Sequence, residues 1–317
     1  MKGSHRAIGL TIGIIATVAF AWYAVHALRD VDLARFTSTR ALLGIAIAAF
    51  FYASIIPISA WAWRQLLRGS NVRRSWRELV EIMAITQMAK YVPGNVGVHL
   101  GRAAMSVAKG IPGRPLGISM MVETLLAVTA AVLVGLAGIA LSGPGSRVLA
   151  DEINASLWMT ATVVVLILSL GLLLRFLVVP LVARFAPRHT WLLSDGIAPD
   201  PIHSAQGFAA YAANYVFIGI GIALMSYVLL PEIAHDPALL CASFAIAWVA
   251  GFFTPGAPAG LGVREGLMLI ILASAYDKAD ALVIVIALRL ATMLGDTLSF
   301  LAGYLLLLDS RKRSSAT

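Results

Sequence analysis

Apolar residues in this chain gather into long runs that are separated by short polar stretches. Six runs approach or exceed the ~20 residues that a helix needs to cross a bilayer, and they predict spans at 7–27, 41–62, 115–141, 156–179, 207–230 and 281–308. Two further apolar regions, 78–109 and 238–276, are cut by Pro-Gly dipeptides into pieces of about 12–16 residues. Such pieces are too short to cross, so the pattern predicts an all-α polytopic membrane protein with six full spans and two re-entrant half-helix hairpins.

The first apolar run has a second interpretation as a cleavable signal peptide, because Lys2 and Arg6 precede it. The run extends over 7–27, however, and is longer than the core of a typical signal peptide. Trp22 and Tyr23 near its end suit a membrane interface. We therefore expect a retained first helix.

The two interruptions share one arrangement, which is Pro-Gly, seven residues and then arginine. The dipeptides at 93–94 and 255–256 precede Arg102 and Arg264, so the motifs lie 162 positions apart in a chain of 317 residues. Chance is the alternative explanation, since the chain has 27 Gly and 13 Pro. The order of the predicted spans around each motif agrees at the same offset, which favours an internal repeat.

The basic residues predict the orientation of the chain. With the N-terminus in the cytoplasm, 16 of the 24 Lys and Arg residues lie on the cytoplasmic side and 5 on the outer side, as the positive-inside rule expects. Lys90, Arg264 and Arg289 remain at membrane depth. Both termini are then cytoplasmic. Three full spans in each half are an odd number, so the repeats 1–150 and 151–317 of the single membrane domain must have opposite topology.

Composition and motifs exclude several classes of protein. The chain is 60% hydrophobic and 13% charged, with a mean hydropathy of +0.87, unlike an ordinary soluble globule. The net charge of +8 is clustered beside the spans, which argues against a nucleic-acid partner. The single Cys241 permits no intrachain disulfide, and no metal site or cofactor is expected. No ATP-binding loop, hydrolase elbow or metalloprotease helix occurs, and no catalytic residue is predicted.

The helix breaks are candidate anion-binding sites. Because Pro removes a donor and Gly permits a turn, second half-helices are predicted at 95–108 and 261–275. Their N-termini point toward the bilayer midplane from opposite sides, where free N–H groups favour anions, phosphate above all. Arginine and lysine near the breaks add positive charge. The predicted substrate-binding residues are Lys90, Pro93, Gly94, Asn95, Gly97, Arg102, Pro255, Gly256, Gly260, Gly262, Arg264 and Glu265.

Three other charges fall inside apolar spans and are candidate ion-pair partners, namely Glu123, Arg289 and Asp296. Glu123 would neutralise Lys90 or Arg102. Asp296 follows Arg289 by seven residues on one helical face, and it is most simply the partner of that arginine or of the arginine in the second motif. Either carboxylate could instead carry a coupling proton. The alternative for the motif arginines is structural, as an ion pair within the membrane or a side chain that reaches the cytoplasmic surface.

The strings KYVPGNVG at 90–97 and GLGVRE at 260–265 resemble the flippase-like membrane domain of lysylphosphatidylglycerol synthase/flippase proteins. The resemblance covers about residues 5–310. It implies movement of a polar lipid between leaflets, with a headgroup cavity lined by Lys90, Arg102, Arg264 and Glu265. Members that transfer lysine have an additional cytosolic domain, so that activity is not expected here. The Ala-Pro-Ala run at 257–259 departs from a more Gly-rich family pattern and leaves the substrate open.

The favoured function is therefore a lipid flippase-like transporter of a bacterial or archaeal inner membrane. Its cargo would be a phospholipid or a polyprenyl-phosphate-linked lipid. One alternative is a membrane enzyme acting on lipid-linked sugars or phosphates, with Glu265 or Glu123 as the acid/base. Another is a non-catalytic subunit that positions a partner synthase or glycosyltransferase.

Overall fold

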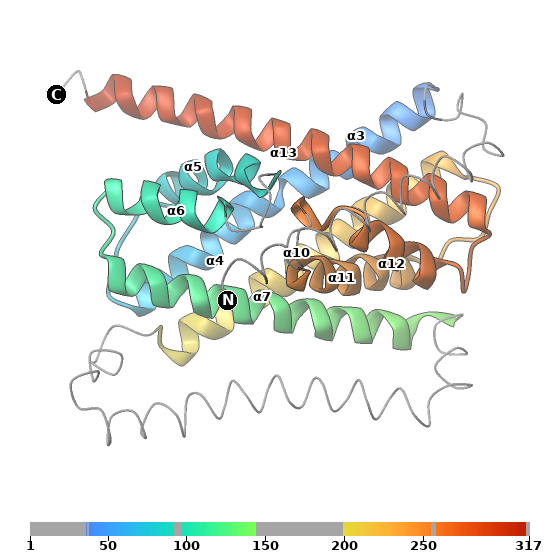
Figure 1. The fold of residues 1–317 in the computed structure, drawn as a ribbon, viewed down its shortest axis with the longest axis horizontal. Helices are drawn as coiled ribbons and strands as arrows, with labels where there is room; N and C mark the ends of the chain where they lie inside the picture. Colours follow the sequence, from blue (N-terminus) through green and yellow to red (C-terminus); the bar gives the residue numbers. More distant parts are fainter. Residues whose placement is uncertain (1–35, 37, 92–96, 144–198, 255–257, 315–317) are drawn as a thin grey trace, which may run out of the picture.

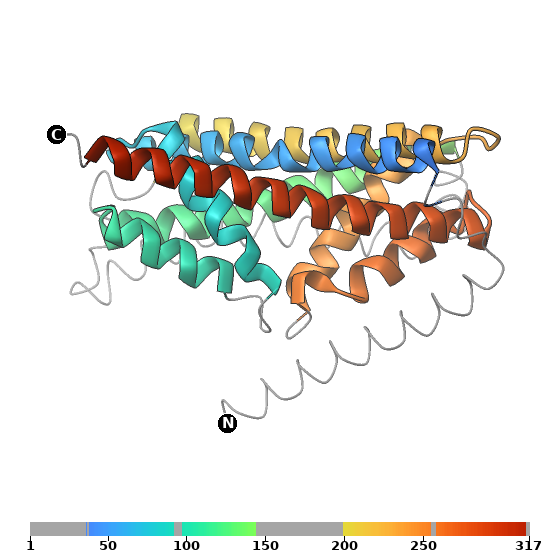
Figure 2. The same cartoon turned by 90° about the horizontal axis from the view of Figure 1, so that it is seen from above.

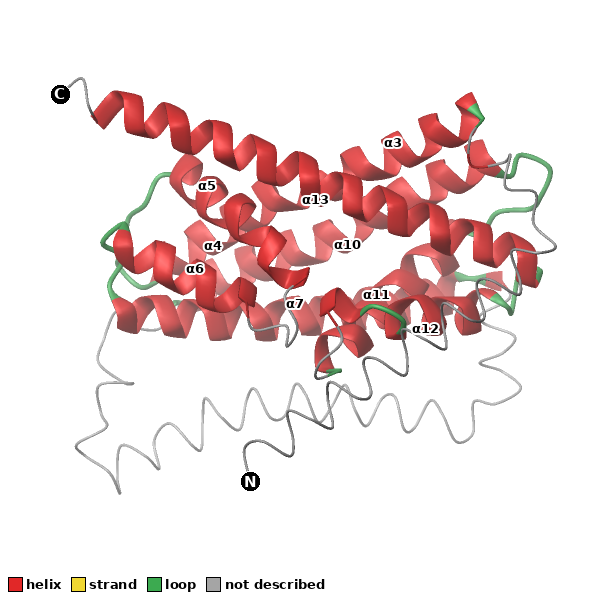
Figure 3. Ribbon diagram, turned by 45° about the horizontal axis from the view of Figure 1, so that its top comes forward, coloured by secondary structure: helices red, strands yellow, loops and turns green. Residues whose placement is uncertain are grey.

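The computed structural model describes residues 36, 38–91, 97–143, 199–254 and 258–314. Every regular element in these ranges is helical, as Figure 3 shows, and no strand occurs among them. Four helical runs are long and apolar enough to cross a membrane, namely Thr39–Gly69, Gly113–Leu141, Pro201–Leu229 and Lys278–Ser310. They coincide with four of the six predicted spans. The other two predictions, 7–27 and 156–179, fall outside the described residues.

The long helices are α3 (Thr39–Ala53) with α4 (Ile55–Gly69), α7 (Gly113–Leu141), α10 (Pro201–Leu229) and α13 (Lys278–Ser314). The α3–α4 run is interrupted only at Ser54. Pro57 has no N–H to donate to the carbonyl of Ala53, so one bond of the helical ladder is absent there. The Ser54 hydroxyl donates to the carbonyl of Phe50 at 2.8 Å, which bends the run without ending it.

Both predicted interruptions coincide with breaks between shorter helices. The first broken pair consists of α5 (Trp76–Thr86), the 3-10 turn η1 (Gln87–Tyr91) and α6 (Gly97–Ala108). The second consists of α11 (Pro237–Phe253), the 3-10 turn η4 (Pro258–Gly260) and α12 (Val263–Leu272). A long helical run precedes and follows each pair, and α10 begins 162 positions after α3. The helix order around the two breaks is therefore the same.

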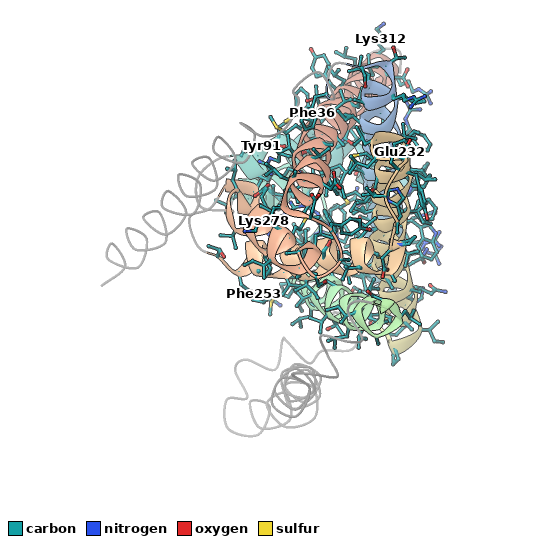
Figure 4. The ribbon with its side chains drawn as sticks, turned by 90° about the vertical axis from the view of Figure 1, so that its right-hand side faces the viewer. Phe36, Tyr91, Glu232, Phe253, Lys278 and Lys312 are labelled. Atoms are coloured by element: carbon teal, nitrogen blue, oxygen red, sulfur yellow. The ribbon has the colours of Figure 1, made fainter. Side chains whose placement is uncertain are left out.

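The two broken pairs approach each other from opposite ends of the molecule. In Figure 1, α13 lies across the other helices, with α5 and α6 toward one end and α11 and α12 toward the other. Figure 2 shows the breaks near the middle, where η1 contacts η4. From there α6 and α12 run in opposite directions. Tyr91 and Phe253, which end η1 and α11, lie on the same side of the molecule, away from Glu232 (Figure 4).

The remaining helices form the wall behind the breaks. The α10 helix packs against α3, α4, α7 and α11, while α13 packs against α3, α5 and α12. Large side chains at these contacts are fully buried, including Trp63, Ile222, Met225, Leu240 and Phe244. Both broken pairs are thus held by a tightly packed layer of long helices.

Close packing of α7 against α11 depends on a glycine. A Cβ added at Gly138 would lie 2.7 Å from the carbonyl oxygen of Ala238 and 2.9 Å from Cβ of Ala242. The contact involves backbone, which cannot move aside as a flexible side chain can. Gly117 on the same helix would meet nothing within 4 Å.

The Gly138→Ala variant should therefore be less stable than the Gly117→Ala variant. The expected difference in the free energy of unfolding is roughly 1–3 kcal/mol, the usual cost of overpacking. Both variants gain the same helix propensity, so the comparison isolates the clash. Thermal unfolding in detergent followed by tryptophan fluorescence measures it. Equal melting temperatures would contradict the packing of α7 on α11.

Candidate functional site

The first break is tied to α13 through one carboxylate. Three side chains of η1 donate to Asp296: Lys90 Nζ to Oδ1 at 2.6 Å, Gln87 Nε2 to Oδ1 at 3.2 Å and Tyr91 OH to Oδ2 at 2.6 Å. Lys90 Nζ also donates to the Tyr52 hydroxyl on α3 at 2.9 Å. Asp296 itself is only 1% exposed. The network explains how a polar 3-10 turn is held among apolar helices, because each donor has a buried partner.

The arginine of the first motif forms a two-pronged ion pair between α6 and α7. Arg102 Nη1 donates to Glu123 Oε1 at 2.8 Å, and Nη2 donates to Oε2 of the same carboxylate. The guanidinium carbon lies 3.7 Å from the ring centroid of Trp63, whose Nε1 donates to Ser119 Oγ at 3.1 Å. Bidentate pairing and ring stacking fix the guanidinium plane. Arg102 does not reach the surface, as its 5% exposure shows.

The arginine of the second motif has a different environment. Its aliphatic stem crosses two glycines, since a Cβ at Gly251 or Gly260 would lie 2.5 or 2.7 Å from the Cγ or Cδ atom of Arg264. The guanidinium carbon lies 5.0 Å from the ring centroid of Phe244. Among the described residues, no carboxylate forms an ion pair with Arg264, and its Nε has no hydrogen-bond partner. The two glycines therefore leave room for the side chain of Arg264, and no described carboxylate beside it neutralises its charge.

Glu265, the next residue, contacts the N-terminus of α12 and the neighbouring α13. Its Oε2 accepts the backbone N–H of Gly262 at 2.7 Å, and its Oε1 lies 3.2 Å from Arg289 Nη1 on α13. Gly262 has a φ of 82°, a conformation that favours glycine. Both carboxylate oxygens thus serve to cap α12 and to attach it to α13.

A cavity of about 260 Å³ lies between the two breaks. From the first broken pair its lining includes Lys90, Val98, His99 and Arg102, and from the second Phe252, Ala259, Gly260 and Arg264. The α3, α4, α7 and α10 helices form the remaining wall, where Tyr52, Ser59, Glu123, Tyr211, Asn214 and Tyr215 contribute polar groups. The volume is below the ~300 Å³ at the lower end of pockets for drug-sized ligands, so it suits a small polar headgroup.

The predicted site residues separate into four groups. Those that line the cavity are Lys90, Arg102, Gly260, Arg264 and the charge partner Glu123. Gly262, Glu265 and Arg289 lie on the α13 side of the second break. Gly97 shapes the first break, because a Cβ there would lie 2.5 Å from the carbonyl oxygen of Ala89. Pro93, Gly94, Asn95, Pro255 and Gly256 lie outside the described residues.

The ion-pair predictions have mixed outcomes. Glu123 is the partner of Arg102, which is one of the two partners expected for it. The expectation that Asp296 pairs with Arg289 or Arg264 is wrong, because its partner is Lys90. Two residues on one face of α13 contact neighbouring elements more readily than each other. Asp296 faces η1, whereas Arg289 faces α12.

Sequence analysis missed the neutral polar residues of the cavity. Tyr52, Tyr211, Asn214 and Tyr215 lie within long apolar helices, where single hydroxyl or amide groups barely alter hydropathy. One signal was present in the sequence. Tyr211 and Asn214 are three residues apart, which places two polar groups on one face of a membrane helix.

Asp236, at the start of the second broken pair, connects three neighbouring elements. Its Oδ2 accepts the Ser142 hydroxyl at 2.7 Å, its Oδ1 accepts the Leu239 N–H at 2.9 Å, and its own N–H donates to the Tyr276 hydroxyl at 2.8 Å. Burial raises the pKa of Tyr276 above its ordinary value, so the hydroxyl stays neutral. These bonds connect the end of α7, the start of α11 and the α12–α13 loop.

Comparison with known protein families tests the resemblance that the two motif strings suggested. Residues 7–299 match the family model described as the lysylphosphatidylglycerol synthase TM region. No curated protein matches the chain. The family match includes both helix breaks, the first three long helical runs and α13 as far as residue 299, and it confirms the resemblance seen in the two motif strings. The chain therefore belongs to the lysylphosphatidylglycerol synthase TM region family, whose members are membrane proteins related to lipid handling.

Proposed function

We propose that this protein is a flippase-like transporter that moves a lipid with an anionic headgroup between leaflets. The headgroup would occupy the cavity between the two breaks while the acyl chains stay outside, because about 260 Å³ cannot hold a whole lipid. The two broken pairs would be re-entrant hairpins of an inverted repeat. The cavity between them would open to each side of the membrane in turn. The membrane would be a bacterial or archaeal inner membrane, with both termini in the cytoplasm.

The observation that carries this proposal is Arg264, for which no carboxylate among the described residues forms an ion pair. A guanidinium at membrane depth without a counter-charge is unfavourable by several kcal/mol. The matching Arg102 is paired with Glu123, but the position 162 residues after Glu123 is Val285, which cannot provide a carboxylate. An anionic headgroup would supply the missing charge and gain charge-assisted hydrogen bonds.

Carrier activity explains the acidic residues better than enzyme activity does. The two carboxylates considered as general acid/base groups are both engaged, Glu123 with Arg102 and Glu265 with Arg289 and the Gly262 N–H. A general base needs a free acceptor within reach of the proton that it removes. We infer that the protein moves lipid without transforming it, and that transport is facilitative or coupled to an ion gradient.

The Arg264→Gln variant tests this function. In vesicles containing the purified protein and acyl-labelled phosphatidylglycerol, a membrane-impermeant quencher measures leaflet exchange. We expect the variant to exchange lipid at least about tenfold more slowly, because a charge-assisted hydrogen bond contributes about 1.5–3 kcal/mol. Arg68→Gln, which changes an exposed arginine on α4, is the matched control. Equal rates for wild type and Arg264→Gln would exclude this binding site.

A further inference from the structure

The cavity contains more unused hydrogen-bonding groups than any other part of the described chain. Six buried side-chain polar atoms among the described residues have no partner, and four belong to residues that line this cavity. They are Nε of Arg102, Nε of Arg264, the hydroxyl of Tyr211 and Oδ1 of Asn214. Buried polar atoms are usually satisfied, so four exceptions in one cavity indicate groups kept for a ligand.

Two of these atoms form a subsite on α10. Tyr211 and Asn214 are 5% and 7% exposed and lie on one face of the helix. The Asn214 amide nitrogen donates to Ser59 Oγ at 2.8 Å, which leaves Oδ1 as a free acceptor. The Tyr211 hydroxyl lies next to the carboxylate of Glu123, and the contact falls short of a well-formed hydrogen bond. The subsite is therefore suited to a ligand group that donates hydrogen bonds.

Within the described part of the chain, the charges around the cavity leave one positive charge uncompensated. Lys90, Arg102 and Arg264 are positive, while Asp296 and Glu123 are negative. The two ion pairs are complete, so the excess belongs to Arg264. A headgroup with a single negative charge neutralises the cavity, whereas a dianion or a cation leaves a net charge in a medium of low dielectric constant.

The ring of His99 also lines the cavity, and in its neutral form it adds no charge to this balance.

We propose that the cavity selects a phosphodiester lipid with one net negative charge and a hydroxyl-bearing headgroup, through Arg264 at the phosphate and Asn214 and Tyr211 at the hydroxyl. This specificity rests on the proposed transport function. A choline headgroup lacks O–H and N–H donors and would leave the Asn214 oxygen unpaired. A headgroup that carries lysine has a net positive charge, and a phosphomonoester can carry two negative charges. All three should therefore be disfavoured.

Binding and transport are measured separately on the full-length protein. Binding uses dihexanoyl phosphatidylglycerol and dihexanoyl phosphatidylcholine, followed by tryptophan fluorescence, to which Trp248 in the cavity wall contributes, and by thermal shift. We expect the glycerol lipid to bind about tenfold more tightly, which corresponds to about 1.4 kcal/mol. Transport uses acyl-labelled lipids with glycerol, choline, ethanolamine and lysylglycerol headgroups. The glycerol lipid should again move about tenfold faster than the choline lipid.

Variants on α10 decide whether the subsite causes the preference. Tyr211→Phe and Asn214→Leu should each reduce the ratio of glycerol to choline binding several-fold, whereas Tyr304→Phe on the exposed face of α13 should not. Asn214→Asp keeps the side-chain shape and removes the excess positive charge. It should shift the preference from the glycerol headgroup toward the zwitterionic ethanolamine headgroup, which provides a gain of function that a misfolded variant cannot show.

The outcomes separate this inference from the proposed function. Equal binding of glycerol and choline lipids, or an unchanged ratio in Asn214→Leu and Asn214→Asp, would overturn the headgroup subsite even if lipid exchange occurs. Selective binding that depends on Asn214 would support the subsite even if no labelled lipid crosses the membrane. In that case the transport function, and not the specificity, would be wrong.

Discussion

An Asp296→Ala substitution should lower the free energy of unfolding by roughly 3–5 kcal/mol, the cost of breaking a buried ion pair. It removes the only carboxylate that Lys90 contacts among the described residues, and it also leaves the donors of Gln87 and Tyr91 without their acceptor. All three donors belong to η1, so the turn that positions the first break would lose its attachment to α13. Lipid exchange should fall with it, because Lys90 lines the cavity.

Thermal unfolding in detergent, followed by tryptophan fluorescence, measures the effect of Asp296→Ala on stability. Asp309→Ala is the matched control, because Asp309 lies on the same helix and pairs with Arg77 at the exposed surface. Surface pairs are screened by solvent, so we expect little change. The double variant Lys90→Met/Asp296→Leu should recover most of the lost stability, since it leaves no unpaired charge. A single variant as stable as wild type would show that Asp296 does not hold η1.

The helical architecture was predictable because the membrane imposes one length scale. Runs of about 20 apolar residues must be helices whose backbone groups are satisfied internally, and four predicted spans within the described part are helices. The breaks were predictable for a local reason, because proline removes a donor and glycine permits positive φ. Gly260 and Gly262 have φ values of 68° and 82° at the second break.

The ion pairs were less predictable, because they depend on packing between elements that are distant in the chain. Lys90 and Asp296 are 206 residues apart, and sequence spacing along α13 favoured a different partner. The Arg102–Glu123 pair was among the expected alternatives, and its two helices are adjacent in the chain. Pairing across distant elements follows from the positions of the helices, which hydropathy does not encode.

The arginines of the two motifs have different surroundings. Arg102 is held by Glu123, whereas Arg264 has glycine and an aromatic ring around it and no carboxylate among the described residues. An internal repeat predicts equivalent backbone positions but not equivalent side-chain partners. We therefore infer that the anionic headgroup binds in the second half, where Val285 stands at the position equivalent to Glu123.

Removing one partner of the Arg102–Glu123 pair should change both stability and lipid preference. Glu123→Gln leaves a guanidinium that is 5% exposed without its carboxylate, so we expect a loss of roughly 3–5 kcal/mol in unfolding free energy. The charge around the cavity rises by one unit. The variant should therefore prefer a phosphomonoester over a phosphodiester, and dihexanoyl phosphatidic acid should raise its melting temperature more than that of wild type.

The double variant Arg102→Met/Glu123→Leu separates the effect of the net charge around the cavity from the effect of the ion pair itself. It removes one positive and one negative group, so the excess charge at Arg264 is unchanged, and apolar side chains of similar size often replace a buried pair without loss of stability. We expect near wild-type melting and an unchanged preference for the singly charged phosphodiester, measured by thermal shift with both lipids. If the double variant instead binds neither lipid, Arg102 contacts the headgroup directly. If it prefers the phosphomonoester, the charge balance around the cavity does not determine specificity.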